Sequence, residues 1–187
     1  MTLTTSLVWR TAGPADAEAV ARLHADSWRR FYRGAYADTF LDGDVVADRH
    51  AVWSARLAAP GRSTTILAED GPALAGFVHV ILDHDPRWGS FVDNLHVTVD
   101  RHRGGIGTAL LARAAAAVLA DAAAPSLYLW VLAQNDAAQA FYRARGGIAA
   151  GSEPVAPPGG VPGRLHGTPA KLRLTWTDVT GLAASPG

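Results

Sequence analysis

The segment from residue 91 to residue 114 constrains the fold of this chain more than any other part of the sequence. Residues 91–99 are rich in β-branched and apolar side chains, which is typical of a strand. Gly104, Gly105 and Gly107 follow within a short turn, and an alanine-rich run from Thr108 predicts a helix. Such a turn brings backbone N–H groups and the positive end of a helix dipole together. The sequence therefore predicts an anion-binding turn, and a phosphate-bearing ligand is the first hypothesis.

The spacing within this turn excludes two common phosphate loops. A Walker A loop ends in Gly-Lys-Ser/Thr, whereas Gly107 is followed directly by Thr108. A dinucleotide fingerprint needs a small residue where Leu110 stands, and no suitable acidic residue for Mg²⁺ follows the turn. The same residues also fit a tight strand-to-helix connection that holds no ligand.

A second segment with an unusual polar stripe lies further along the chain. Residues 127–131 alternate as a strand does, and Asn135 or Asp136 can cap the helix that follows. On that helix Asn135, Ala138 and Tyr142 share one face, because they are spaced at i, i+3 and i+7. A face that is polar, then small, then polar suits a narrow ligand lying along the helix.

Together the two segments resemble the cofactor motifs of the GNAT superfamily of N-acetyltransferases. That family carries Arg/Gln-x-x-Gly-x-Gly/Ala after a strand and Asn-x-x-Ala-x-x-Phe-Tyr-x-x-x-Gly further on. The matching residues here, at the family's spacing, are Gly105, Ile106, Gly107, Asn135, Ala138, Phe141, Tyr142 and Gly146.

One position departs from the family pattern. His102 stands where the family has arginine or glutamine. A neutral imidazole anchors pyrophosphate less well than a guanidinium does. The backbone amides of residues 104–108 can still bind the phosphates, and Arg101 or Arg103 could supply the positive charge.

The resemblance implies a fold, a cofactor and an activity. We expect an α+β fold in which helices flank a mixed, mostly antiparallel sheet, with one domain over residues 1–180 and a frayed tail over residues 181–187. The implied reaction is direct attack of a primary amine on acetyl-CoA in a ternary complex. The resemblance assigns cofactor binding to Val97, Thr98, Val99, His102, Arg103, Gly104, Gly105, Ile106, Gly107, Thr108, Asn135, Ala138 and Tyr142.

The implied reaction needs an acid and a base. A primary amine with a pKa of about 10 is almost entirely protonated at neutral pH, and a departing thiolate benefits from a proton donor. Tyr142 stands where the family has such a donor. For the base we rank Asp93 ahead of His96, although a hydrogen bond at a strand end and a satisfied half-buried histidine are the alternative readings. Simple alternation places these two side chains on opposite faces of the strand unless a bulge intervenes.

The acceptor amine is less constrained. The resemblance places its pocket near residues 27–36, which hold three arginines and four aromatic residues, Trp28, Phe31, Tyr32 and Tyr36. An aromatic wall suits an apolar or cationic amine, and arginines suit a carboxylate. The aromatics could equally belong to the core. Amino-acid derivatives, polyamines, amino sugars and peptide N-termini all remain open.

Composition excludes several other classes of protein. Seventeen basic and seventeen acidic residues give no net charge, so we expect no nucleic-acid partner. The absence of cysteine removes disulfides, thiolate metal sites and cysteine nucleophiles, and the seven histidines lack metal-site spacing. No apolar run is long enough to span a membrane, so we expect a cytoplasmic protein that binds a small-molecule amine or a peptide N-terminus. The resemblance leaves both a monomer and a homodimer open. A catalytically silent sensor of CoA, or a partner-binding domain, is the alternative.

The remaining elements can be predicted in outline. Residues 83–89 and 152–169 are polar or rich in proline and glycine, so we expect loops there. We expect helices after Asp16 and over residues 45–57, a hairpin of residues 65–68 and 74–81, and further strands over residues 7–10 and 172–176.

Overall fold

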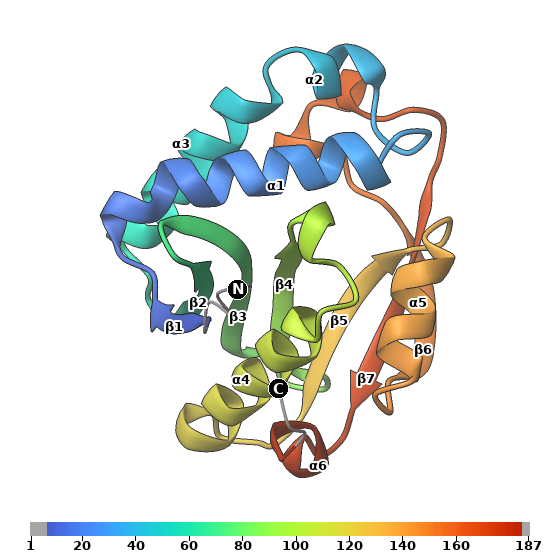
Figure 1. Cartoon of the computed structure of the whole chain (residues 1–187). Coiled ribbons are helices and arrows are strands. Elements are labelled where there is room, and N and C mark those ends of the chain that lie inside the picture. The colour runs from blue at the N-terminus through green and yellow to red at the C-terminus, as the bar shows by residue number, and fades with distance from the viewer. Residues whose placement is uncertain (1–6, 185–187) are drawn as a thin grey trace.

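A computed structural model describes residues 7–184 of the chain. One seven-stranded sheet runs through the molecule in the order β1-β2-β3-β4-β5-β7-β6 (Figure 1). Every neighbouring pair is antiparallel except β4 and β5. This single domain confirms the α+β class predicted from the sequence. The strands are β1 (Val8–Thr11), β2 (Ser63–Asp70), β3 (Ala73–Asp85), β4 (Gly89–Val97), β5 (Leu127–Leu132), β6 (Ile148–Pro154) and β7 (Ala170–Trp176).

Helices cover both faces of the sheet. The helix α4 (Ile106–Asp121) buries Leu110 and Leu111 against Val78 and Leu129 on one face. The opposite face carries α1 (Ala17–Phe31) and α3 (Val45–Ala58), whose side chains pack on Leu67 and Phe77 (Figure 1). The shorter helices are α2 (Asp38–Asp42), α5 (Asp136–Arg143) and α6 (Thr180–Ala183). None of the helices described over residues 7–184 has the length and apolar character needed to cross a bilayer.

The structure differs from the sequence prediction around two expected loops. Residues 83–89 belong largely to β3 and β4, and Asp85 Oδ1 closes the tight turn between them by accepting bonds from the N–H groups of Arg87 and Trp88. Residues 152–154 continue the edge strand β6. Most side chains of both segments face solvent, so their sequences show no apolar alternation. They form strands because their backbones pair with a neighbouring strand, and not because their side chains are buried.

The C-terminal region is also more ordered than expected. The short helix α6 overlaps residues 181–187, which we expected to fray, and Leu182 is buried in the same core as α4. The last part of the predicted tail, residues 185–187, lies outside the described residues. Residues 155–169 are a loop as expected, but Arg164 ties it to Asp48 of α3 at 2.6 Å.

Strands β4 and β5 separate halfway along their length. They pair in parallel only at Ser90–Leu127, Phe91–Tyr128 and Val92–Leu129. The β3–β4 pairing skips one residue at Asp93, because Val80 opposes Val92 whereas the preceding residue of β3 opposes Asn94. This bulge bends β4 at the point where it parts from β5. The fold thereby opens a gap in the middle of its own sheet.

Candidate functional site

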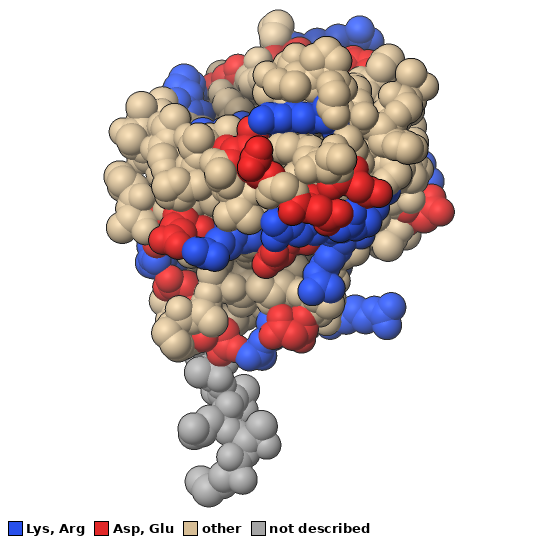
Figure 2. All heavy atoms as spheres, turned by 90° about the horizontal axis from the view of Figure 1, so that it is seen from above, with Lys and Arg blue, Asp and Glu red and all other residues tan. Residues whose placement is uncertain are grey.

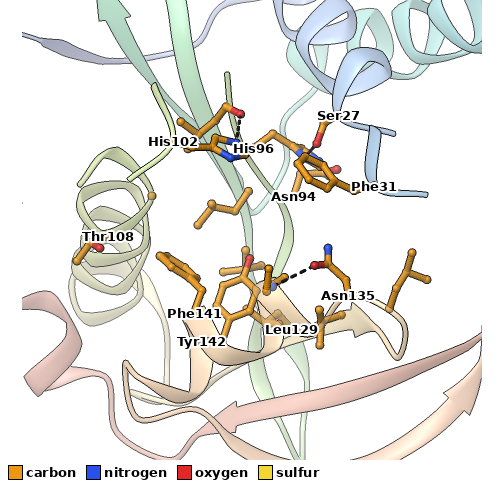
Figure 3. A pocket seen from close by; sticks show the side chains of 18 of the residues that line it. Ser27, Phe31, Asn94, His96, His102, Thr108, Leu129, Asn135, Phe141 and Tyr142 are labelled. Carbon is orange, nitrogen blue, oxygen red and sulfur yellow. Dashed lines mark hydrogen bonds between the residues drawn. The ribbon is translucent and has the colours of Figure 1, made fainter. Parts of the chain in front are cut away.

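A cavity of about 600 Å³ lies where β4 and β5 separate. Residues 92–97 of β4 and residues 129–132 of β5 form its two sides, and residues of α1, α5 and the turn before α4 complete its lining. Figure 3 shows polar side chains from α1, β4 and the α5 region converging on this space, with Leu129 of β5 beside them. Outside the cavity the charges are mixed, because acidic and basic side chains are interspersed on the face in Figure 2.

The glycine turn forms one end of the cavity. Gly105 caps α4 with a φ of +82°, a left-handed conformation that favours glycine. A Cβ atom on Gly107 would lie 3.3 Å from Cζ of Phe141, so a side chain there would press on α5. The first N–H groups of α4 have no intrahelical partners and face the turn. This geometry suits an anion, and Arg103 and Thr108 also line the cavity here.

Four of the predicted cofactor residues do not line this cavity. Ile106 is 4% exposed and packs in the core, and Gly104 is exposed at the turn outside the cavity. Thr98 and Val99 line a neighbouring hollow of about 410 Å³ beside the end of α1. The helical period of α4 turns the Ile106 side chain toward the core. Strand β4 ends at Val97, so Thr98 and Val99 no longer follow the wall of the cavity although they are next to the motif in the sequence.

His102 lines the cavity, but its side chain is held by other residues of the protein. Its Nε2 lies 2.9 Å from the carbonyl oxygen of Val97, so this nitrogen carries the proton and donates it to the backbone. The imidazole also stacks on Phe31, with the ring centroids 5.8 Å apart. Arg101, the nearest arginine before it, forms an ion pair with Asp70. Both side chains therefore already have partners within the protein.

The polar stripe predicted on α5 faces the cavity. Asn135 Oδ1 accepts a bond from the N–H of Ala138 at 3.0 Å, which caps the helix and turns the amide nitrogen of Asn135 into the cavity (Figure 3). Tyr142 is 9% exposed, and its hydroxyl points into the same space (Figure 3). Burial raises the pKa of the Tyr142 phenol above its ordinary value, so the phenol keeps its proton at neutral pH.

The bulge in β4 brings Asp93 and His96 to the same face of the sheet. Asp93 Oδ2 lies 2.6 Å from Arg56 Nη1 of α3, and His96 Nδ1 lies 2.7 Å from Ser27 Oγ of α1. Simple alternation, which placed them on opposite faces, was therefore wrong here. Burial lowers the pKa of His96 to about 4, against a smaller opposing effect of the Asp93 carboxylate, so the imidazole is neutral at pH 7.

Only two of the four predicted acceptor aromatics reach the cavity. Phe31 and Tyr32 line it. Trp28 and Tyr36 are each 7% exposed and pack edge to face with ring centroids 4.9 Å apart, and the Arg49 guanidinium lies 4.3 Å from the Trp28 ring centroid. These two aromatics belong to the core between α1, α2 and α3 because the helical period of α1 turns Trp28 away from the sheet gap.

Sequence reasoning missed Arg145 as a site residue. Its guanidinium lines the cavity, where Nε and Nη2 donate to Thr108 Oγ1 at 3.0 and 2.5 Å, and it lies 3.8 Å from the ring centroid of Phe141. An arginine near the end of a helix is ordinarily explained by the helix dipole, so the sequence offered no signal of this role. Ser27, the partner of His96, was also not assigned to the site.

The described residues hold no group of three or more His, Cys, Asp or Glu side chains that could bind a metal ion. The groups that line the cavity are backbone N–H groups, amides, hydroxyls, guanidinium groups, the imidazoles of His96 and His102 and the carboxylate of Asp93. This set of groups suits a phosphate-bearing ligand and proton transfer.

Comparison with solved structures supports the fold. An N-acetyltransferase from Thermoplasma acidophilum in complex with coenzyme A superposes with a TM-score of 0.69 at 17% identity, covering 91% of this chain and 99% of that chain. A GCN5-related N-acetyltransferase from Rhodopseudomonas palustris gives 0.69 at 21% identity, covering 95% and 99%. The protein YncA from Salmonella typhimurium with acetyl-CoA gives 0.61 at 16% identity, covering 91% and 93%.

Sequence comparison identifies the family. No curated protein matches the sequence. The model of the acetyltransferase (GNAT) family matches residues 18–146, which is more than half of the chain and includes both motifs of the cavity. With this match, a sheet that opens between β4 and β5 and a glycine turn at the start of α4, the chain belongs to the acetyltransferase (GNAT) family.

Proposed function

We propose that this protein is an N-acetyltransferase that moves an acetyl group from acetyl-CoA to a primary amine. The observation that carries the proposal is the continuous cavity from the glycine turn to the Tyr142 hydroxyl and on to the Asp93–His96 pair. It offers an anion site, a proton donor and proton acceptors in one space. The donor and the amine would meet there, which suits direct attack without a covalent enzyme intermediate.

The residues of the cavity fit acetyl-CoA. The left-handed Gly105 and the closely packed Gly107 keep the start of α4 open to phosphates. Beyond Val92 the β5 side of β4 has no strand partner, and the gap is lined by residues of both strands, so an extended ligand arm can lie between them. Two of the similar structures, those from T. acidophilum and S. typhimurium, contain coenzyme A or acetyl-CoA.

When bound, acetyl-CoA supplies an activated acetyl group on a thioester and a thiol leaving group. Tyr142 then acts as the general acid. Its phenol is protonated, because burial raises its pKa, and its hydroxyl is directed into the cavity, where it can donate a proton to the departing sulfur (Figure 3).

His96 serves as the proton acceptor, and Asp93 supports it. Because burial lowers the His96 pKa to about 4, the imidazole is neutral at pH 7. It is a weak base in this state, so it can accept a proton from the amine nitrogen only as that nitrogen bonds to the acetyl carbon and becomes more acidic. The Asp93 carboxylate already binds Arg56 and accepts a bond from Asn94 Nδ2 at 2.7 Å, which makes it the less available base. Its negative charge stabilises the protonated His96 instead, because it raises the pKa of that imidazole.

Phe31 and Tyr32 form the wall that the acceptor meets. Aromatic rings bind an apolar stem or a cationic amine, and desolvation beside them favours the neutral, nucleophilic form of the amine. Small-molecule amines and peptide N-termini are the acceptors that this wall suits.

The test is a calorimetric titration of the purified protein with acetyl-CoA, followed by a free-thiol assay across a panel of amines. We expect saturable binding and thiol release with at least one amine. Gly105→Val is the control, because φ at this position is +82° and a β-branched residue would distort the turn. No binding to the wild-type protein would refute the proposal, whereas binding without thiol release for any amine would favour a silent CoA sensor.

A further inference from the structure

We propose that Arg145 binds a phosphate of the cofactor and supplies the cationic side chain that His102 does not. This inference rests on the proposed function, because it concerns the donor half of the same cavity. Arg145 stands at a position of the second motif where the family pattern specifies no residue, and the order of residues in the chain does not bring it near the glycine turn.

The fold places Arg145 at the phosphate end of the cavity. The residue follows α5, and its guanidinium reaches across to Thr108 in the first turn of α4, with Nε–Oγ1 at 3.0 Å and Nη2–Oγ1 at 2.5 Å. A third bond runs from Nη1 to the carbonyl oxygen of Phe141 at 2.8 Å, and the guanidinium lies over the ring of the same residue at 3.8 Å. The guanidinium is thus held in one orientation before any ligand arrives.

The positive charge of Arg145 has no acidic partner in the part of the chain that the structure describes. Its bonds go to a hydroxyl and a carbonyl, and none of the ion pairs among residues 7–184 includes it. The group is half-buried, and desolvation lowers its pKa, which is the signature of a cation that burial disfavours. A bound anion would offset this cost. The negative partner that the described residues do not provide for Arg145 would therefore come from a ligand.

The other cations near the turn are less suited to this role. Arg101 is paired with Asp70, and Nε2 of His102 donates to Val97. Arg103 lines the cavity too, but it is exposed at the rim, where solvent and salt screen its charge. Arg145 is the cation that combines partial burial, a fixed orientation and a free charge.

Thr108 adds a second donor at the same point. Its Oγ1 accepts both N–H bonds from Arg145, so its own hydroxyl proton must point elsewhere. Thr108 lines the cavity in the first turn of α4, beside N–H groups that have no intrahelical partner. Arg145 therefore binds the anion directly and also sets Thr108 as a donor toward it.

The experiment compares Arg145→Met with Arg143→Met, an exposed arginine two residues away that does not line the cavity and whose loss changes the net charge equally. Binding of coenzyme A is measured by calorimetry, and binding of pantetheine, which lacks every phosphate, by ligand-observed NMR. Arg145→Met should weaken coenzyme A binding roughly tenfold to hundredfold, the range of a charge-assisted hydrogen bond, and leave pantetheine binding unchanged. Arg143→Met should change neither by more than about twofold. Arg145→Lys should fall between, because lysine keeps the charge and loses the planar fork.

The possible failures are distinguishable. If the wild-type protein does not bind coenzyme A, the proposed function itself fails. If it binds, and Arg145→Met behaves like Arg143→Met, the function stands and this inference is overturned. Equal loss of coenzyme A and pantetheine binding would also overturn it, because Arg145 would then only hold α5 against α4. A loss that persists with dephospho-coenzyme A supports the inference and assigns the contact to the pyrophosphate.

Discussion

Three histidines of this protein are buried and neutral in the native state. We therefore expect its free energy of unfolding to decrease as the pH is lowered from 7 to 5. His24, His79 and His96 lie between the sheet and the helices α1 and α3, and burial lowers the pKa of each. Each ring uses Nδ1 within the protein: that of His24 accepts a bond from Trp53 Nε1 at 3.0 Å, and that of His79 lies 2.8 Å from Thr65 Oγ1. Protonation of these rings would place positive charge in the core, which the nearby Asp93 carboxylate offsets only in part for His79 and His96.

The size of the effect follows from the pKa values. In the unfolded chain a histidine titrates near its ordinary pKa of about 6.5, whereas His79 and His96 in the native state titrate at about 4. As the pH falls below about 6.5 the unfolded state takes up protons that the native state does not, so stability is lost at up to about 1.4 kcal/mol per pH unit for each group. Between pH 7 and pH 5 each of these two should contribute about 2 kcal/mol of loss, and His24 adds to it. The total is a large part of an ordinary stability of about 5–15 kcal/mol.

The assay is urea denaturation followed by tryptophan fluorescence at pH 7, 6 and 5. His79→Gln should lower the free energy of unfolding at pH 7. It should also make the loss of stability between pH 7 and pH 5 smaller by about 2 kcal/mol, the contribution of one histidine, because glutamine can still bond to Thr65 but does not titrate. The exposed His50 provides the matched substitution, His50→Gln. Carboxylates with lowered pKa values, such as Asp16, lose their stabilising effect only below about pH 4 and do not interfere. A free energy of unfolding that stays constant within about 0.5 kcal/mol from pH 7 to pH 5 would refute the reasoning.

Three further outcomes are expected. Tyr142→Phe should reduce kcat about a hundredfold and leave acetyl-CoA affinity within about twofold, as measured by steady-state kinetics and calorimetry; equal loss of both would exclude the acid role. Ser27→Ala removes the Nδ1 partner of His96 and should lower kcat several-fold, again without loss of cofactor affinity. Gly89→Ala should destabilise the fold by roughly 2–4 kcal/mol in urea denaturation, because φ is +83° and the new Cβ would lie 2.5 Å from the carbonyl oxygen of Ser126; an unchanged midpoint would contradict this.

The donor half of the candidate site was largely predictable from the sequence. Glycines at a helix start and the i, i+3, i+7 stripe of α5 are local patterns, because each depends only on neighbouring residues and on the helical period. Gly105, Gly107, Asn135 and Tyr142 were therefore identified before any tertiary contact was known, and the structure places all of them around the cavity.

The proton-transfer groups were only partly predictable. Asp93 and His96 stood out as polar residues on an apolar strand. The face of the sheet to which each side chain points depended on the bulge, which arises from the pairing of β4 with β3. The neutral state of His96 depends on burial beneath α1, which is more than 60 residues away in the sequence. Local pattern carries no information on either point.

The sequence by itself determined the class of fold, the glycine turn and the polar face of α5, because hydrophobic period and backbone conformational preference act over a few residues. Tertiary structure alone decided that β4 and β5 separate after Val92, that Trp28 and Tyr36 lie in the core, and that Arg145 meets Thr108. Each of these is a contact between segments far apart in the chain. Their geometry depends on how whole helices and strands pack, and no short stretch of residues encodes it.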